Sequence, residues 1–144
     1  MCSCHGALSL PEVELIECSR AREQDSTAVP FVTHTVLYAA RGGAIRTVLD
    51  VPTSVTLDDC GPRSPIPCSV ALDVRVEGDA VRFEETANRT TSACDHPSIA
   101  ANKPLPGASG WNSASWQRAR ATDRRICDTR GRYVWQRGAL RRAP

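Results

Sequence analysis

The chain has 144 residues, of which 41% are hydrophobic and 24% are charged, and its formal net charge is +2. This length and composition predict one folded domain and exclude collagen-like and disordered chains. Its uninterrupted apolar runs are only a few residues long, whereas a membrane-spanning helix needs about 20, so no transmembrane segment is expected.

The first predicted strand lies behind the helix- and strand-breaking Pro11. Residues 12–18 alternate loosely between apolar and polar types, which is typical of a half-buried strand. Residues 1–11 are expected to form a Cys-containing N-terminal tail. A polar loop follows at residues 19–28.

The clearest local signal is a hairpin made from residues 35–40 and 45–51. Gly42 and Gly43 lie between these β-rich runs and supply the positive φ that a two-residue hairpin loop requires. This loop sets the predicted register, in which Ala40 faces Ile45, Tyr38 faces Thr47, Val36 faces Leu49 and His34 faces Val51. Pro52 is expected to end the strand, and residues 55–58 to begin another short one.

A second hairpin is predicted from residues 70–77 and 81–85, with the turn at Gly78 and Asp79. The shortest loop places Arg75 opposite Arg82, which is unfavourable. A register that slides by two residues would instead pair Arg75 with Glu84 and Glu77 with Arg82. The pattern leaves both registers open.

A long loop is expected at residues 86–110, which lack a periodic apolar signal. The helical period then predicts a helix over residues 113–128, capped by Asn112 or Ser113. Asp123 lies in the apolar stripe of this helix, and we expect it to accept a hydrogen bond from an Arg of the C-terminal segment, locking the helix to a closing hairpin. The candidate donors are Arg120, three residues earlier, and Arg130 or Arg132 after the Gly131 turn. That hairpin is predicted at residues 132–141 after Gly131, with its turn at Arg137 and Gly138.

These elements predict an α+β fold that is mainly antiparallel β. Two or three hairpins form a meander sheet, and one C-terminal α-helix is followed by a short β-hairpin. Residues 12–142 are expected to form a single globular domain.

Seven cysteines are a high number for a reducing cytosol unless they bind metal or are reactive. As disulfides, Cys60 would pair with Cys68 and Cys94 with Cys127, while Cys18 would pair with Cys4 or with Cys2 and leave one thiol over. This favours a periplasmic, outer-membrane-anchored or secreted protein. Residues 1–8 lack the features of a signal peptide, so either a targeting segment lies upstream or the cysteines are inert in a cytosolic protein.

Charge divides unevenly along the chain, because residues 103–144 carry ten basic residues and only two acidic ones. Arginine with interleaved tryptophan suits nucleic acid or an acidic polysaccharide. The anion-binding candidates are Arg118, Arg120, Arg124, Arg125, Trp111 and Trp116. The alternative, which we favour, is that this segment packs over an acidic sheet and its charges are satisfied internally.

The sequence contains no established catalytic motif, so no catalytic residue is assigned. A Cys/His-dependent enzyme around the adjacent Cys94, Asp95 and His96 is an alternative, although neighbouring side chains usually diverge.

Metal ligands could come from Cys2, Cys4, His5 and Cys18, but the chain has no Cys-x-x-Cys spacing. Structural zinc sites favour that spacing, so neither a metal nor a cofactor is expected.

The leading interpretation is a non-enzymatic, disulfide-stapled module of a bacterial envelope or secretome, with a structural or binding role. The bacterial origin is inferred from the arginine bias, because Lys103 is the one lysine among 18 Lys and Arg residues. No partner or oligomeric state follows from the sequence.

Overall fold

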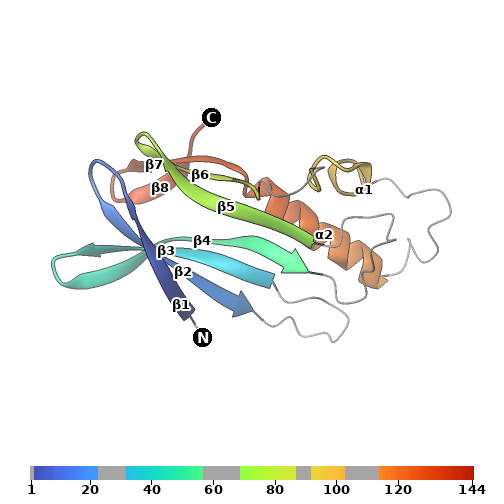
Figure 1. The fold of residues 1–144 in the computed structure, drawn as a ribbon, viewed down its shortest axis with the longest axis horizontal. Helices are drawn as coiled ribbons and strands as arrows, with labels where there is room; N and C mark the ends of the chain where they lie inside the picture. Colours follow the sequence, from blue (N-terminus) through green and yellow to red (C-terminus); the bar gives the residue numbers. More distant parts are fainter. Residues whose placement is uncertain (1, 23–31, 57–68, 87–91, 103–113) are drawn as a thin grey trace.

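Strands dominate the computed structural model, which describes residues 2–22, 32–56, 69–86, 92–102 and 114–144. Eight strands pair in chain order into one antiparallel meander (Figure 1). The strands are β1 (Cys2–Ser9), β2 (Glu14–Arg22), β3 (Val32–Arg41), β4 (Ala44–Thr56), β5 (Ser69–Glu77), β6 (Ala80–Glu85), β7 (Gly131–Gln136) and β8 (Ala139–Arg142). The helices are α1 (Pro97–Ala100) and α2 (Ala114–Asp128). The predicted meander, followed by a helix and a closing hairpin, is confirmed in this coarse form, and the fold is mainly β.

The N-terminal residues correct one expectation, because residues 2–9 form strand β1 and not a tail. Strand β1 pairs with β2, and this pairing sets Cys4 opposite Cys18 and Leu8 opposite Leu15. Residues 2–9 have little hydrophobic alternation of their own. Their strand conformation depends on the partner strand, which local pattern cannot reveal.

The hairpin of β3 and β4 follows the predicted register only near its turn. Gly42 and Gly43 have φ of 60° and 78°, and the pairs Ala40–Ile45 and Tyr38–Thr47 form as predicted. The register then shifts, so that Val36 faces Asp50 and His34 faces Pro52.

Two β-bulges on β4 cause these differences, because each adds one residue that has no partner on β3. The second bulge comes directly after Pro52, so the strand passes this residue and continues to Thr56. Proline is tolerated in a ladder at a bulge, since its missing N–H leaves no donor unpaired. The expected break at Pro52 is therefore wrong.

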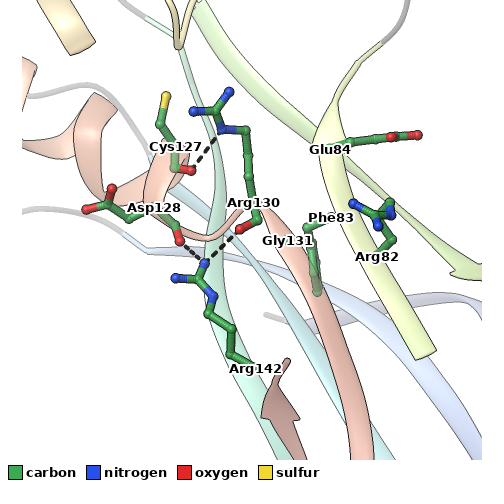
Figure 2. Close-up of a pocket in the computed structure, with 8 residues that line it drawn as sticks. All are labelled: Arg82, Phe83, Glu84, Cys127, Asp128, Arg130, Gly131 and Arg142. Carbon is green, nitrogen blue, oxygen red and sulfur yellow. Dashed lines mark hydrogen bonds between the residues drawn. The ribbon is translucent and has the colours of Figure 1, made fainter. Parts of the chain in front are cut away.

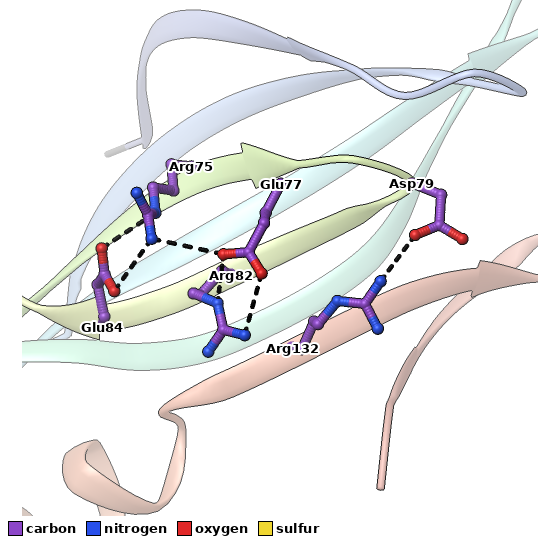
Figure 3. Close-up of polar contacts among 6 residues, drawn as sticks. All are labelled: Arg75, Glu77, Asp79, Arg82, Glu84 and Arg132. Atoms are coloured by element: carbon purple, nitrogen blue, oxygen red, sulfur yellow. Dashed lines mark hydrogen bonds and ion pairs between the residues drawn. The ribbon is translucent and has the colours of Figure 1, made fainter.

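The hairpin of β5 and β6 adopts the shorter-loop register, with Arg75 opposite Arg82 and Val76 opposite Val81. Long side chains relieve the repulsion diagonally (Figure 3). Arg75 Nε lies 3.0 Å from Glu84 Oε1, and Arg82 Nε lies 2.6 Å from Glu77 Oε2. Both ion pairs that would have favoured the slid register thus form without sliding.

The core lies where the meander folds back on itself. Strands β4 and β5 pair only over Ser54–Thr56 and Ser69–Ala71, and β1 contacts β5 while β4 contacts β8. Helix α2 packs against β4 and β5, and in Figure 1 it lies at one end of the strands. The core includes Leu15 of β2, Leu37 of β3, Phe83 of β6 and Ile126 of α2. No helix in the described residues is long and apolar enough to cross a membrane.

Residues 92–102, which fall in the expected long loop, contain α1 and several local hydrogen bonds. The backbone N–H groups of Ala93 and Cys94 donate to the carboxylate of Glu85. His96 caps α1, because its Nδ1 accepts a hydrogen bond from the Ser98 N–H at 3.2 Å. Ala93, Cys94 and Ile99 of this segment are buried in the core, but they follow no periodic apolar pattern, so the sequence predicted a loop here.

Candidate functional site

Chemically reactive side chains gather on the face of β1–β4 that points away from the core. We define the outer-face cluster as Cys2, Cys4, Cys18, Arg20, His34, Tyr38 and Asp50. The strand register brings these residues together, since Cys2 faces Arg20, Cys4 faces Cys18 and Arg20 faces His34. None of them belongs to the main hydrophobic core.

Three sulfur atoms lie at one end of this cluster. The Sγ atoms of Cys4 and Cys18 are at disulfide distance, and Cys2 is an exposed free thiol. All three Sγ atoms lie within 4.8 Å of one another. The sequence analysis left open which of Cys2 and Cys4 pairs with Cys18, and in the structure it is Cys4.

The same cluster holds a polar triad. His34 Nδ1 lies 2.7 Å from one carboxylate oxygen of Asp50, and an Arg20 guanidinium nitrogen lies 2.5 Å from the other. His34 is 8% exposed, whereas the Arg20 and Asp50 side chains are 33% and 27% exposed, so the triad has one buried member and two that reach water.

Within the cluster, Tyr38 lies beside the free thiol, and its Oη is 3.8 Å from Cys2 Sγ. The contact with Cys2 raises the pKa of Tyr38, and slight desolvation adds to the effect. Tyr38 therefore stays protonated at neutral pH and can donate to the sulfur.

The second cysteine pair joins the segment after β6 to α2. The Sγ atoms of Cys94 and Cys127 are at disulfide distance, and both residues are buried. Cys94 consequently offers no free thiol, and His96 Nδ1 is engaged by Ser98. The arrangement gives no support to an enzyme built on Cys94, Asp95 and His96. Cys60 and Cys68 lie outside the described residues.

A cavity of about 490 Å³ opens near the C-terminal end of α2 (Figure 2). Three arginines line it: Arg82, Arg130 and Arg142. The other lining residues come from β6, β7 and the end of α2: Phe83, Glu84, Gly131, Cys127 and Asp128. The arginines are held in place by neighbouring groups. Arg130 Nε donates to the Cys127 carbonyl at 3.1 Å, Arg142 donates to the carbonyls of Asp128 and Arg130, and Arg82 pairs with Glu77.

The predicted anion-binding residues are not assembled into one exposed surface by the described structure. Arg120 is fully buried and its guanidinium lies 2.9 Å from Asp123, so it cannot be a surface contact. Arg124 is half-buried, and Arg125 is exposed. Trp111 and the side chains of Trp116 and Arg118 lie outside the described part of the chain.

The cavity arginines were missed by the sequence analysis for a definable reason. They come from β6, from the residue before β7, and from β8, so only the strand register brings them together. Arg130 and Arg142 lie in the basic segment 103–144, but neither was among the predicted anion-binding residues. His5, the other suggested metal ligand, lies beside Glu17 and does not join the three sulfurs.

Comparison with protein-family models, with curated proteins and with solved structures finds no match to this chain.

Proposed function

We propose that the protein is a non-enzymatic, disulfide-stapled module of an oxidising compartment, with a structural or binding role in a bacterial envelope or outside the cell. The observation that carries this proposal is the placement of four cysteines in two pairs at disulfide distance. Disulfides persist in exported proteins and are rare in a reducing cytosol.

Each pair joins a peripheral segment of the chain to a neighbouring element. Cys4 and Cys18 fasten the edge strand β1, whose side chains are mostly exposed, to β2. Cys94 and Cys127 fasten the segment containing α1, which also buries Ala93 and Ile99 in the core, to α2. The chain-entropy account gives about 3 kcal/mol for the first closed loop and about 4 kcal/mol for the second.

Thermal unfolding with and without a reductant tests the proposal. Reduction should lower the melting temperature, and Cys94→Ala combined with Cys127→Ala should reproduce most of that loss in oxidised protein. An exposed-site control is Cys2→Ala, which removes a thiol without removing a bridge. Equal melting temperatures for oxidised, reduced and doubly substituted protein would contradict a stapling role.

A second candidate function is the binding of an anionic group, from nucleic acid or an acidic polysaccharide, in the arginine-lined cavity. Three arginines line one open space, and the guanidinium groups of Arg130 and Arg142 are oriented by backbone carbonyls. Planar guanidinium groups held in this way suit carboxylate, sulfate and phosphate oxygens.

Titration with a heparin fragment and with a single-stranded oligonucleotide tests this candidate. Arg130→Gln and Arg142→Gln should each weaken binding and reduce the slope of log K against log salt by about one. The matched control is Arg141→Gln, because Arg141 is exposed, lies next to Arg142 on β8, and does not line the cavity. Equal effects of all three substitutions would show that binding depends on net charge and not on this cavity.

A further inference from the structure

Cys2 differs from the other described cysteines because it is a free thiol beside an existing disulfide. Its Sγ lies within 4.8 Å of both sulfur atoms of the Cys4–Cys18 pair. All three residues are on the same face of β1 and β2, and β1 is the edge strand of the sheet. By contrast, Cys94 and Cys127 are buried, and within the described residues no thiol lies beside them.

We propose that Cys2, Cys4 and Cys18 form a thiol–disulfide exchange site. The Cys2 thiol first loses its proton to water, and its thiolate attacks Cys18 Sγ. The Cys2–Cys18 bond forms as the Cys4–Cys18 bond breaks, and Cys4 leaves as a thiolate that takes up a proton. One disulfide is lost and one is gained, so the step needs neither an oxidant nor a reductant.

Burial decides which sulfur leaves. Cys18 is fully buried, whereas Cys4 is exposed on β1. A thiolate released at Cys4 is hydrated at once, but one released at Cys18 would be desolvated, which disfavours the charged form. Attack at Cys18 Sγ with departure of Cys4 is therefore the favoured direction.

Tyr38 assists from the side of the nucleophile. Its phenol is 3.8 Å from Cys2 Sγ and can donate a hydrogen bond to the developing thiolate. Arg20 lies directly opposite Cys2 on β2 and adds a positive charge nearby, although this charge is shared with Asp50.

The consequence is an exposed thiol that moves between two positions of the edge strand. Either position presents a nucleophile to an external disulfide, which is the chemical class of partner that such a site would take. This inference rests on the proposed function, since it requires that the Cys4–Cys18 disulfide forms.

Disulfide mapping of the oxidised full-length protein tests the proposal. The protein is incubated at pH 8, its free thiols are labelled with N-ethylmaleimide, and it is cleaved after glutamate without reduction. The glutamates separate the relevant cysteines, because residues 1–12 contain Cys2 and Cys4 while residues 18–23 contain Cys18. The other four cysteines lie in residues 24–77 and 86–144. Fragmentation of the linked 1–12 and 18–23 peptides then shows whether Cys2 or Cys4 carries the label.

The proposal expects label on both Cys2 and Cys4, with the label on Cys4 appearing more slowly when the incubation is moved from pH 8 to pH 5, because the thiolate is the attacking species. Tyr38→Phe should slow its appearance at pH 8. Cys2→Ser should abolish all label on residues 1–12.

One control variant separates the position of the thiol from the number of thiols. In the double variant Cys2→Ser with Ser3→Cys, the thiol moves to the opposite face of β1, since successive residues of a strand alternate. Label should then be confined to position 3, with none on Cys4.

Each result bears on a different claim. Linked peptides with label on Cys2 alone at every time would overturn the exchange site while leaving the stapled module intact. Unlinked peptides with label on Cys2, Cys4 and Cys18 would overturn both the exchange site and the Cys4–Cys18 bridge of the stapled module.

Discussion

Asp123 is a carboxylate held almost out of water. It is 2% exposed, and one of its carboxylate oxygens lies 2.9 Å from the Arg120 guanidinium. Burial raises the pKa of Asp123 from its ordinary value of 3.8 to about 6, although the positive charges of Arg120 and Arg124 act in the opposite direction. Desolvation also lowers the pKa of Arg120. Loss of hydration therefore outweighs the attraction within this pair.

The raised pKa makes a specific prediction about pH. Folded protein holds the Asp123 proton to a higher pH than unfolded protein, so the stability from this group is complete below about pH 4 and is lost as the pH rises through about 6. Asp123→Asn cannot ionise and should lack this dependence. The free energy of unfolding of the wild type, minus that of Asp123→Asn, should thus fall by on the order of 3 kcal/mol from pH 4 to pH 7.

Urea unfolding of both proteins at several pH values measures this difference. Asp128→Asn is a suitable control, because Asp128 is exposed at the end of the same helix. A difference that stays constant from pH 4 to pH 7 would show that Asp123 is ionised in both states.

Asp123 is paired with Arg120 of the same helix, and Tyr133 makes the predicted connection between helix and hairpin instead. The Tyr133 hydroxyl donates to the Thr129 carbonyl at 2.8 Å and so joins the end of α2 to β7, while Arg142 donates to the Asp128 carbonyl. The helical pattern correctly placed Asp123 on the buried side of the helix. It could not identify the connection to the hairpin, because that depends on residues meeting after the Gly131 turn.

Tyr133→Phe should lower the free energy of unfolding by about 1–2 kcal/mol, since the buried Thr129 carbonyl loses its donor. Ring packing is kept, because Phe preserves the edge contact of position 133 with Phe83. Chemical denaturation measures the change, with Tyr38→Phe as an exposed-face comparison. Equal stability of Tyr133→Phe and wild type would mean that water replaces the hydroxyl.

At the scale of strands, turn chemistry was the most informative feature of the sequence. The glycines at positions 42, 43, 78 and 138 all have positive φ and lie in the predicted hairpin turns. Registers were right close to these turns and wrong beyond the first bulge of β4, because a bulge shifts every later pair and leaves no clear mark in the local pattern.

The diagonal ion pairs of β5 and β6 give a prediction at this scale. The hydrogen bond from Arg82 lowers the pKa of Glu77, so the carboxylate favours folding at neutral pH and loses this effect as the pH falls through its folded-state pKa. A double-mutant cycle with Glu77→Gln and Arg82→Gln should give a favourable coupling energy at pH 7.

Salt provides the internal check on that cycle. Both side chains are partly exposed, so the coupling should shrink strongly at about 1 M salt, where the screening length is short. Coupling that is absent at low salt would indicate that water, and not the diagonal ion pairs, relieves the charge repulsion between Arg75 and Arg82.

At the scale of the whole molecule, one of the suggested cysteine pairs is found at disulfide distance. The pairing of Cys94 with Cys127 was suggested from elements alone, and the structure places these two sulfurs together. The outer-face cluster could not be anticipated in the same way. It needs β1 as a strand, which only its pairing with β2 establishes.

The folding of the meander onto itself was equally hidden from the sequence. Alternating residues show which side of a strand is apolar, but they do not show which strands will contact across the core. The contacts of β1 with β5 and of β4 with β8, and the cavity near β6, β7 and β8, depend on this arrangement of strands across the core.

The oxidation state of the cysteines tests the central claim most directly. Protein taken from its native source is denatured in acid, its thiols are alkylated, and the mass increase is read from the intact chain. Four of the seven cysteines belong to the two pairs seen in the structure, so at most three should be alkylated. Alkylation of all seven would contradict a disulfide-stapled module.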